Sequence, residues 1–185
     1  RKNRLNMISS KIVERCDTKN FSALLNIVEK YKPELIFHTA ALPLAKISNL
    51  TLDEAKEGSI DSTMNILDAI HKTQNNFKKY KCKRFIYISS SMVYGDFKKS
   101  SVTEKDETNP KDAYGVMKLA GEFITKGISK LYNIPYTIIR PSAVYGPMDM
   151  NKRVSQIFIE KALDQKLITV AGKDEKLDFT YINDL

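Results

Sequence analysis

Short apolar runs alternate along the chain with segments in which apolar residues recur at helical spacing. The apolar runs lie at residues 34–41 (ELIFHTAA), 84–90 (RFIYISS) and 134–140 (IPYTIIR). The segments with helical spacing lie at about residues 18–31, 52–72 and 110–132. Strands that are apolar on both faces and alternate with helices are typical of a parallel sheet. The pattern therefore predicts an α/β fold built on a doubly wound parallel sheet.

Residue types at the ends of these segments predict where the helices begin. The expected N-caps are Asp17 or Thr18 for the first helix, Thr51 in a capping box with Glu54 for the second, and Asn109, followed by Pro110, for the third. Lys32–Pro33 should end the first helix. Further along, we predict a helix over residues 153–165 and short strands over 167–170 and 179–182.

The same periodicity predicts which helix positions face the core. In the second helix these are Ala55, Met64, Leu67 and Ile70. In the third helix they are Ala113, Val116, Met117, Ala120, Phe123, Ile124, Ile128 and Leu131. The alternation of strands and helices is broken at Gly146–Pro147. We therefore predict one domain over residues 1–146 and the start of a smaller region over 147–185.

Composition narrows the functional classes. The 185 residues can bury one core, and 42% of them are hydrophobic, as in globular proteins. The net charge of +8 is compatible with nucleic acid or phosphorylated ligands. However, the lysines are dispersed, and the densest basic group, residues 78–84, falls in a predicted linker without interleaved aromatic residues. We expect no nucleic-acid partner.

Membranes and disulfides are not expected either. No apolar run approaches the roughly 20 residues of a membrane span, and no secretory signal is present. Cys16 and Cys82 could form one bridge, but reduced thiols in a cytoplasmic protein are the favoured interpretation. We predict no metal site.

Three residues stand in a pattern typical of proton transfer. Ser90 lies at the end of a predicted strand, and Tyr114 and Lys118 lie four residues apart on a predicted helix, hence on one face. A free tyrosine, with a pKa of about 10, is a poor base, but a nearby ammonium favours its phenolate. Ser90 could donate a hydrogen bond to a substrate oxygen. Taken alone, a tyrosine and lysine at this spacing also fit a surface pair.

Five stretches together resemble one family. They are residues 33–41 (PELIFHTAA), 84–95 (RFIYISSSMVYG), 114–118 (YGVMK), 140–147 (RPSAVYGP) and 177–185 (LDFTYINDL). In order and spacing they are similar to the extended short-chain dehydrogenases/reductases, in the NAD-dependent epimerase/dehydratase group that acts on nucleotide sugars. The resemblance implies a Rossmann-like fold, NAD as cofactor, with NADP not excluded, and a nucleotide-diphosphate sugar as substrate.

The resemblance also implies roles for individual residues. Tyr114 would be the catalytic acid/base, Lys118 would hold the nicotinamide ribose, and Ser90 would be the catalytic serine. The other implied cofactor-binding residues are Asp17, Ala40, Ala41, Ser59, Ser89, Pro141 and Val144. The other implied substrate-binding residues are Ser91, Arg153, Val154, Thr169 and Ala171. Asp17 could instead be a helix cap, and Arg153 an exposed helix-start residue.

The chain also departs from the family pattern. The glycine-rich phosphate loop is absent, so the resemblance implies a fragment lacking both ends that should bind NAD poorly alone. Leu177 stands where relatives often carry an arginine.

At Ser91 and Met92 the 4,6-dehydratases carry an acidic pair, so the resemblance favours C4 epimerisation through a 4-keto sugar. A dehydratase, reductase or decarboxylase of the same group, or a non-catalytic binding protein, stays open. Family members often form homodimers through helices like 52–72 and 110–132. His38 is interpreted as a core histidine in preference to a catalytic one.

Overall fold

The computed structural model describes residues 13–41, 51–147, 149, 153–170, 172 and 177–185. They fall into two compact units, one spanning Glu14–Arg140 and one that includes Pro141–Leu185. Each unit is described by itself.

The larger unit is a parallel sheet covered on one face by helices. Its strands are β1 (Leu35–His38), β2 (Arg84–Ile88) and β3 (Tyr136–Ile139), in the order β1-β2-β3. Residue Ile36 pairs with Phe85, which pairs with Tyr136, so the strands run in register with β2 in the middle. This confirms the predicted parallel α/β architecture.

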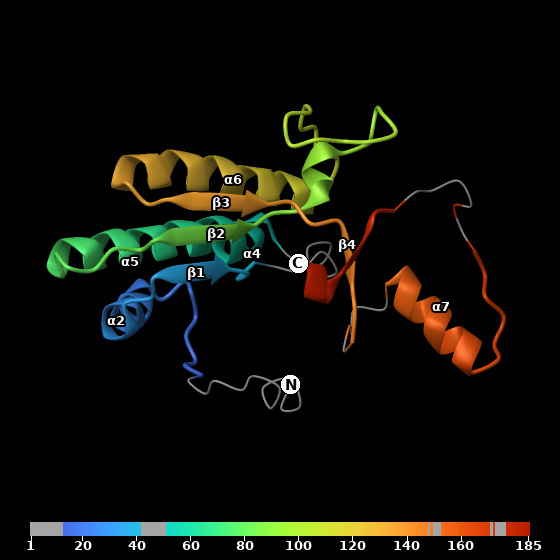
Figure 1. Ribbon diagram of the computed structural model, residues 1–185, viewed down its shortest axis with the longest axis horizontal. Helices are drawn as coiled ribbons and strands as arrows, with labels where there is room; N and C mark the ends of the chain where they lie inside the picture. Colours follow the sequence, from blue (N-terminus) through green and yellow to red (C-terminus); the bar gives the residue numbers. More distant parts are fainter. Residues whose placement is uncertain (1–12, 42–50, 148, 150–152, 171, 173–176) are drawn as a thin grey trace. The chain divides into compact units, whose positions relative to one another are not determined.

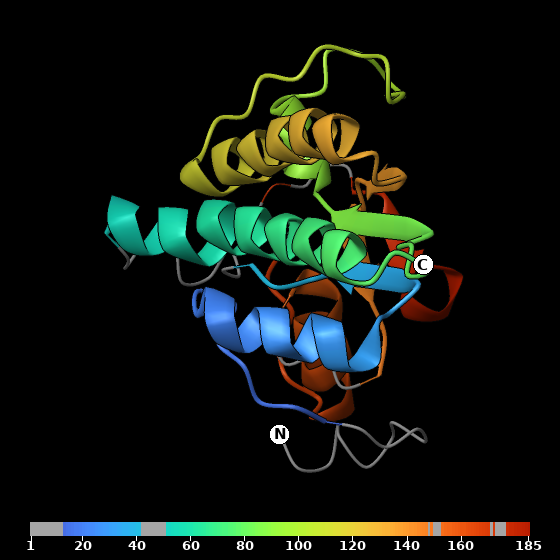
Figure 2. The same ribbon diagram turned by 90° about the vertical axis from the view of Figure 1, so that its left-hand side faces the viewer.

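Three long helices lie side by side on that face (Figures 1 and 2). They are α2 (Phe21–Tyr31), α5 (Ser62–Asn76) and α6 (Ala113–Tyr132). The core forms where α2 and α5 pack on β2, around Leu24, Val28, Leu67, Ile70 and Phe85. Because parallel strands end at the same edge of a sheet, the residues after β1, β2 and β3 lie along one rim, where ligands bind in open α/β sheets.

The described part of the second unit holds two short parallel strands and a helix. The strands are β4 (Ala143–Tyr145) and β5 (Phe179–Tyr181), and the helix is α7 (Val154–Leu163). The short 3₁₀ helix η3 (Ile182–Asp184) follows β5. The strand predicted over residues 167–170 was wrong: these residues are exposed and belong to none of the ladders among the described residues.

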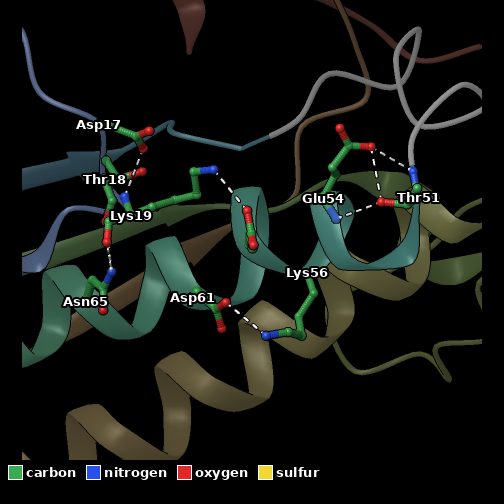
Figure 3. A network of polar contacts seen from close by, with 9 residues as sticks. Asp17, Thr18, Lys19, Thr51, Glu54, Lys56, Asp61 and Asn65 are labelled. Carbon is green, nitrogen blue, oxygen red and sulfur yellow. Dashed lines mark hydrogen bonds and ion pairs between the residues drawn. The ribbon is translucent and has the colours of Figure 1, made fainter.

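The long helix predicted over residues 52–72 is built in three pieces. Helix α4 (Leu52–Lys56) passes into the π-helix η1 (Glu57–Asp61), which continues as α5 to Asn76. The predicted capping box is confirmed, because Glu54 N donates to Thr51 Oγ1 at 3.3 Å and Thr51 N donates to Glu54 Oε2 at 2.9 Å (Figure 3). Ala55, Leu67 and Ile70 are buried as expected, but Met64 is 44% exposed.

Two predicted N-caps were wrong. Helix α2 is capped by Asn20, whose Oδ1 accepts from Ala23 N at 3.1 Å, whereas Asp17 accepts from Lys19 N in the preceding turn. Helix α6 is capped by Asp112, which accepts from Gly115 N at 2.7 Å. The helix begins at Ala113, four residues after Asn109, so Asn109 lies outside its first turn.

The inner face predicted for α6 is confirmed only in part, at Ile124 and Ile128, which pack against the core. The helix exposes Val116, Phe123 and Leu131, which are 46%, 64% and 69% accessible. It buries small and polar residues instead: Gly115, Lys118, Gly121, Glu122, Thr125 and Ser129. The reason is local crowding, since the helix lies so close to β2 that a Cβ on Gly121 would overlap the Tyr87 hydroxyl.

Strand β1 also departs from the expectation of burial on both faces. Leu35 and Phe37 are 57% and 64% exposed, while His38 is buried. The described helices cover the face that Ile36 and His38 occupy, so Leu35 and Phe37 lie on the uncovered face (Figure 1).

Candidate active site

Lys118 and Tyr114 lie together at the carboxyl end of β2. They project from the first turns of α6, and the Lys118 Nζ lies 5.7 Å from the centroid of the Tyr114 ring. The same ammonium lies 5.6 Å from the centroid of the Tyr87 ring and donates a 2.7 Å hydrogen bond to the carbonyl of Ile88. The predicted juxtaposition of phenol and ammonium is therefore present.

Burial changes the acidity of this lysine. Lys118 is only 6% exposed, and desolvation lowers its pKa from 10.5 to about 8. The side chain is therefore mainly cationic at neutral pH. An ammonium has three donors, and among the described residues this one donates only to Ile88 O. A buried cation with donors to spare is suited to hold the hydroxyls of a ligand.

Ser90 lies where β2 passes into the 3₁₀ helix η2 (Ser91–Tyr94). Its backbone is extended, with φ −160° and ψ 152°, and its Oγ accepts from Met92 N at 3.2 Å. Helix α6 packs directly on this segment, because a Cβ on Gly115 would lie 2.7 Å from Met92 O. The residue after Tyr114 thus contacts the residue two beyond Ser90, so the first turn of α6 lies against the segment that carries Ser90.

An ion pair between a fully buried carboxylate and a largely buried guanidinium lies beside this site, and the sequence reasoning missed it. Glu122 Oε1 and Oε2 accept from Nε and Nη2 of Arg140, both at 2.7 Å, and the Ser89 hydroxyl donates to Glu122 Oε1 at 2.6 Å. Burial alone would raise the pKa of Glu122, but the hydrogen bonds from Arg140 and Ser89 outweigh it and hold the pKa below its usual value. Glu122 is therefore a carboxylate.

One sequence signal could have indicated this pair. Glu122 follows Lys118 by four residues, so it shares the helix face that carries the site, and Arg140 stands at the end of a predicted strand. The Ser89 hydroxyl is directed to Glu122, so any contact of Ser89 with a cofactor stays a prediction.

A second buried chain of hydrogen bonds ties β1 to the π-helix. The Thr63 hydroxyl donates to Ser59 O at 2.7 Å, so it accepts from Nε2 of His38, which lies 3.1 Å away. Burial, with a smaller contribution from the charge on Lys118, lowers the pKa of His38 to about 4. The ring is therefore neutral, in agreement with a hydrogen-bonded core histidine.

The remaining predicted cofactor residues of the larger unit lie at several places. Ser59 is buried in η1, and Ala40 and Ala41 follow β1. Asp17 is exposed in the turn before α2, next to Lys19, which forms a 2.9 Å ion pair with Glu57 of η1 (Figure 3). Ser91 opens η2, directly after Ser90.

The other predicted ligand residues belong to the second unit. Pro141 precedes β4, Val144 lies within it, and Arg153 Nη1 donates to Val144 O at 3.0 Å. Val154 begins α7, and Thr169 is exposed in the segment after it. Ala171 lies outside the described residues. Among the described residues no group of three or more His, Cys, Asp or Glu side chains could hold a metal ion.

The chain belongs to the NAD dependent epimerase/dehydratase family, whose sequence profile matches residues 1–185. It is 30% identical to the uncharacterised UDP-glucose epimerase YtcB of Bacillus subtilis, over 99% of this chain and 56% of that protein. It is 29% identical to a dTDP-D-glucose 4,6-dehydratase of Dictyostelium discoideum, over 88% of this chain and 38% of that protein. The chain thus spans about half the length, or less, of these relatives.

Solved structures agree with the fold. A UDP-glucuronic acid 4-epimerase from Bacillus cereus, in complex with UDP-glucuronic acid and NAD, matches with a TM-score of 0.79 and 30% identity. The match covers 98% of this chain and 55% of that one. A UDP-glucose 4-epimerase from Thermotoga maritima, with UDP-glucose, matches with a TM-score of 0.79 and 25% identity, over 97% of this chain and 60% of that one. The Rossmann-like fold and the epimerase/dehydratase class are therefore established.

Proposed function

We propose that this chain forms the catalytic half of an NAD-dependent nucleotide-sugar 4-epimerase. The observation that carries the proposal is the cluster at the end of β2, where the buried ammonium of Lys118 lies beside the Tyr114 ring. Family membership supplies the reaction class, and relatives named as UDP-sugar epimerases support a nucleotide sugar as substrate.

Each residue has a chemical task in this reaction. Tyr114 takes the proton from the sugar C4 hydroxyl and later returns it, because the adjacent ammonium favours the phenolate. The Ser90 hydroxyl donates a hydrogen bond to the same oxygen. Lys118 remains charged. It binds ribose hydroxyls of the cofactor through the N–H groups that do not donate to Ile88 O. The keto sugar must turn over between the two half-reactions so that its other face is reduced.

Two features of the chain support NAD as the cofactor at this proposed site. Lys118 is a buried cation with spare donors, and Ala40 and Ala41, with their small side chains, follow β1 at the ligand-binding rim of the sheet. When bound, NAD supplies the hydride acceptor and donor of the reaction. We include Asp17, Ser59, Ser89, Pro141 and Val144 in this proposed cofactor site.

Epimerisation is favoured over dehydration by the residues that follow Ser90. Elimination of water across C5 and C6 requires an acid and a base, and Ser91 and Met92 provide neither near neutral pH. Met92 is also 38% exposed, so its side chain is not buried in the cluster. For the nucleotide sugar we propose contacts with Ser91, Arg153, Val154, Thr169 and Ala171.

We also propose that the protein is a homodimer in a reducing, cytoplasmic compartment. Helix α6 exposes Val116, Phe123 and Leu131, and α5 exposes Met64, which would leave large apolar side chains in water. Cys16 and Cys82 are free thiols, which suits a reducing compartment. None of the described helices is long and apolar enough to cross a membrane.

The test is turnover by the full-length protein with UDP-glucose, UDP-glucuronic acid and dTDP-glucose, followed by NMR of the sugar products. An epimerase yields the C4 epimer, keeps the hydride internal and releases no net NADH. Tyr114→Phe should lower kcat by at least about a hundredfold, since it removes the proton-transfer group. A 4-keto-6-deoxy product would assign a dehydratase, and unchanged turnover in Tyr114→Phe would overturn the proposed site.

A further inference from the structure

Ser90 is held between two residues that are fixed by the same buried ion pair. On one side, the Ser89 hydroxyl donates to Glu122. On the other, Arg140 Nη1 donates at 2.8 Å to the hydroxyl of Tyr94, which ends the 3₁₀ helix that Ser90 caps. Glu122 and Arg140 are joined by two parallel 2.7 Å hydrogen bonds. The catalytic serine therefore lies in a short segment anchored at both ends.

The bonds around Glu122 form a closed ring across three elements. Ser89 N donates to Ile139 O at 2.7 Å, Ile139 is followed by Arg140, Arg140 binds Glu122, and Glu122 accepts from Ser89 Oγ. The ring thus joins the ends of β2 and β3 to α6. Such a ring resists displacement more than a single contact, because moving any member strains all of the bonds.

Strand geometry carries this constraint to Ser90. Successive side chains of a strand point to opposite faces, and Phe85 and Tyr87 of β2 belong to the core packed under the helices. Ser89 continues that face towards α6, as its bond to Glu122 shows. With Ser89 fixed, the extended backbone of Ser90 is fixed as well, and the bond from Met92 N to Ser90 Oγ holds its hydroxyl.

The burial of Glu122 suits positioning better than direct chemistry. Its side chain is fully inaccessible, and the Arg140 side chain is 13% exposed, so neither carboxylate oxygen is presented to a substrate. Arg140 fills both oxygens of Glu122 in the bidentate geometry that fixes the plane of a carboxylate. Lys118 lies one turn before Glu122 on α6, so fixing the helix at Glu122 also fixes the backbone that carries Lys118.

We propose that Glu122, clamped by Arg140, is a positioning residue that sets the direction of the Ser90 hydroxyl towards the substrate oxygen. It acts through Ser89 on one side and through Tyr94 on the other. This inference rests on the proposed function for its kinetic consequence, whereas the placement of Ser90 is a property of the fold that can be measured without substrate.

The kinetic test compares Glu122→Gln, Ser89→Ala and Ser90→Ala in the full-length protein. Glu122→Gln retains the shape of the side chain but not its charge, so the hydrogen bonds from Arg140 and Ser89 weaken. We expect kcat to fall about tenfold or more in Glu122→Gln, with KM changed less than about threefold, because the reacting groups are misplaced. Ser89→Ala, which leaves the ion pair intact, should show the same change to a smaller extent.

A double-mutant cycle separates positioning from stability. Once Ser90 is replaced by alanine, there is no hydroxyl left to position, so adding Glu122→Gln should lower kcat less than about threefold further. If Glu122 served stability alone, Glu122→Gln would lower kcat by the same factor in the wild type and in Ser90→Ala. Arg140→Lys keeps a positive charge but lacks the planar fork, so it should behave like Glu122→Gln.

Thr125→Val is the matched control. Thr125 is fully buried on the same face of α6, three residues after Glu122, and its hydroxyl has no hydrogen-bond partner among the described residues. We expect its kcat and KM to equal those of the wild type. Wild-type kcat in Glu122→Gln, or strictly multiplicative effects with Ser90→Ala, would overturn the inference.

A measurement without substrate keeps the inference testable if the proposed function fails. The Met92 amide donates to Ser90 Oγ at 3.2 Å, so its hydrogen exchange reports whether Ser90 is held. Exchange at Met92 should be faster in Glu122→Gln and Ser89→Ala than in the wild type and Thr125→Val. Absence of wild-type turnover would refute the proposed function alone, whereas unchanged exchange at Met92 would refute the positioning role.

Discussion

At the scale of single residues, the candidate site depends on two side chains whose pKa values are both lowered by burial. Desolvation lowers the pKa of both Lys118 and His38, to about 8 and about 4. The consequence differs, because the lysine stays mainly charged at neutral pH while the histidine is neutral. A cation can therefore lie beside the Tyr114 ring without a second positive charge at the end of β1.

The lysine predicts an alkaline limit of activity. Above pH 8, the folded protein increasingly loses the Lys118 proton and with it the charge that favours the Tyr114 phenolate. We expect kcat/KM to fall as the pH rises through about 8. In Lys118→Met, kcat/KM should be at least about a hundredfold lower and should no longer decrease as the pH rises through about 8. The measurement is a pH–rate profile from 6 to 10 for both proteins, and a wild-type profile that stays flat beyond pH 9 would contradict it.

The histidine predicts a loss of stability in mild acid. The pKa of His38 is lowered in the folded state, so the unfolded chain binds the proton more readily between about pH 6.5 and 4. The contribution of neutral His38 to the free energy of unfolding is complete above pH 6.5. About 3 kcal/mol of it is lost as the pH falls to 4. His38→Gln, which can still donate to Thr63, should have a free energy of unfolding that falls less between pH 7 and 5.

The second histidine supplies the control for that experiment. The sequence has two histidines, and His71 lies on the surface of α5, stacked on Tyr132 with 3.9 Å between ring centroids. His71→Gln, measured alongside in urea titrations, shows whether the loss of any histidine changes the slope of unfolding free energy against pH. Equal slopes in His38→Gln and the wild type would show that His38 is not the group responsible.

At the scale of elements, helix α6 packs in an unusual way for an amphipathic helix. Its fully buried positions hold small and polar residues, whereas the large apolar Val116, Phe123 and Leu131 are exposed. Close packing on β2 explains the small residues. Of the polar ones, Glu122 is satisfied by Arg140 and Ser89, and Lys118 donates to Ile88 O. Two of its glycines show the contrast: Gly121 faces the Tyr87 ring, whereas no described atom would lie within 4 Å of a Cβ on Gly127.

The two glycines give a matched pair of substitutions. Gly121→Ala forces the Tyr87 ring, which is fully buried, away from the helix, at a cost of about 1–3 kcal/mol in unfolding free energy. Gly127→Ala meets no described neighbour and gains helix propensity, so it should stabilise by up to about 1 kcal/mol. Chemical unfolding of both variants at one protein concentration measures the difference. Similar effects of the two alanines would contradict the close approach of α6 to β2.

At the scale of the whole molecule, the alternation of apolar runs and helical stripes was enough to predict the parallel sheet. The five family-like stretches were enough to predict the family. Local chemistry also predicted the capping box at Thr51, since both partners lie within one turn. By contrast, the faces of α6 could not be predicted from spacing, because burial of Glu122 depends on Arg140 and Ser89, which lie 18 and 33 residues away in the sequence.

The exposed residues of α6 predict an oligomer. If they form the proposed homodimer interface, Phe123→Glu should yield a monomer in sedimentation equilibrium while retaining the circular dichroism of the wild type. A charge placed in an apolar interface is costly unless it is paired. Leu167→Glu is the control, because Leu167 is 85% exposed and lies outside both helices. A dimeric Phe123→Glu protein, or a monomeric wild type, would refute this interface.

The π-helix at Glu57–Asp61 has a consequence for how this region can tolerate insertions and deletions. Ser62 N bonds back five residues to Glu57 O, so the turn holds one residue more than a regular helix. Removing that one residue would turn η1 into regular α-helix while α4 and α5 keep nearly their present directions. The same deletion inside α5 would rotate the flanking part of the helix by about 100° and move its buried face out of the core. A one-residue deletion should therefore be tolerated better at Glu57–Asp61 than within α5.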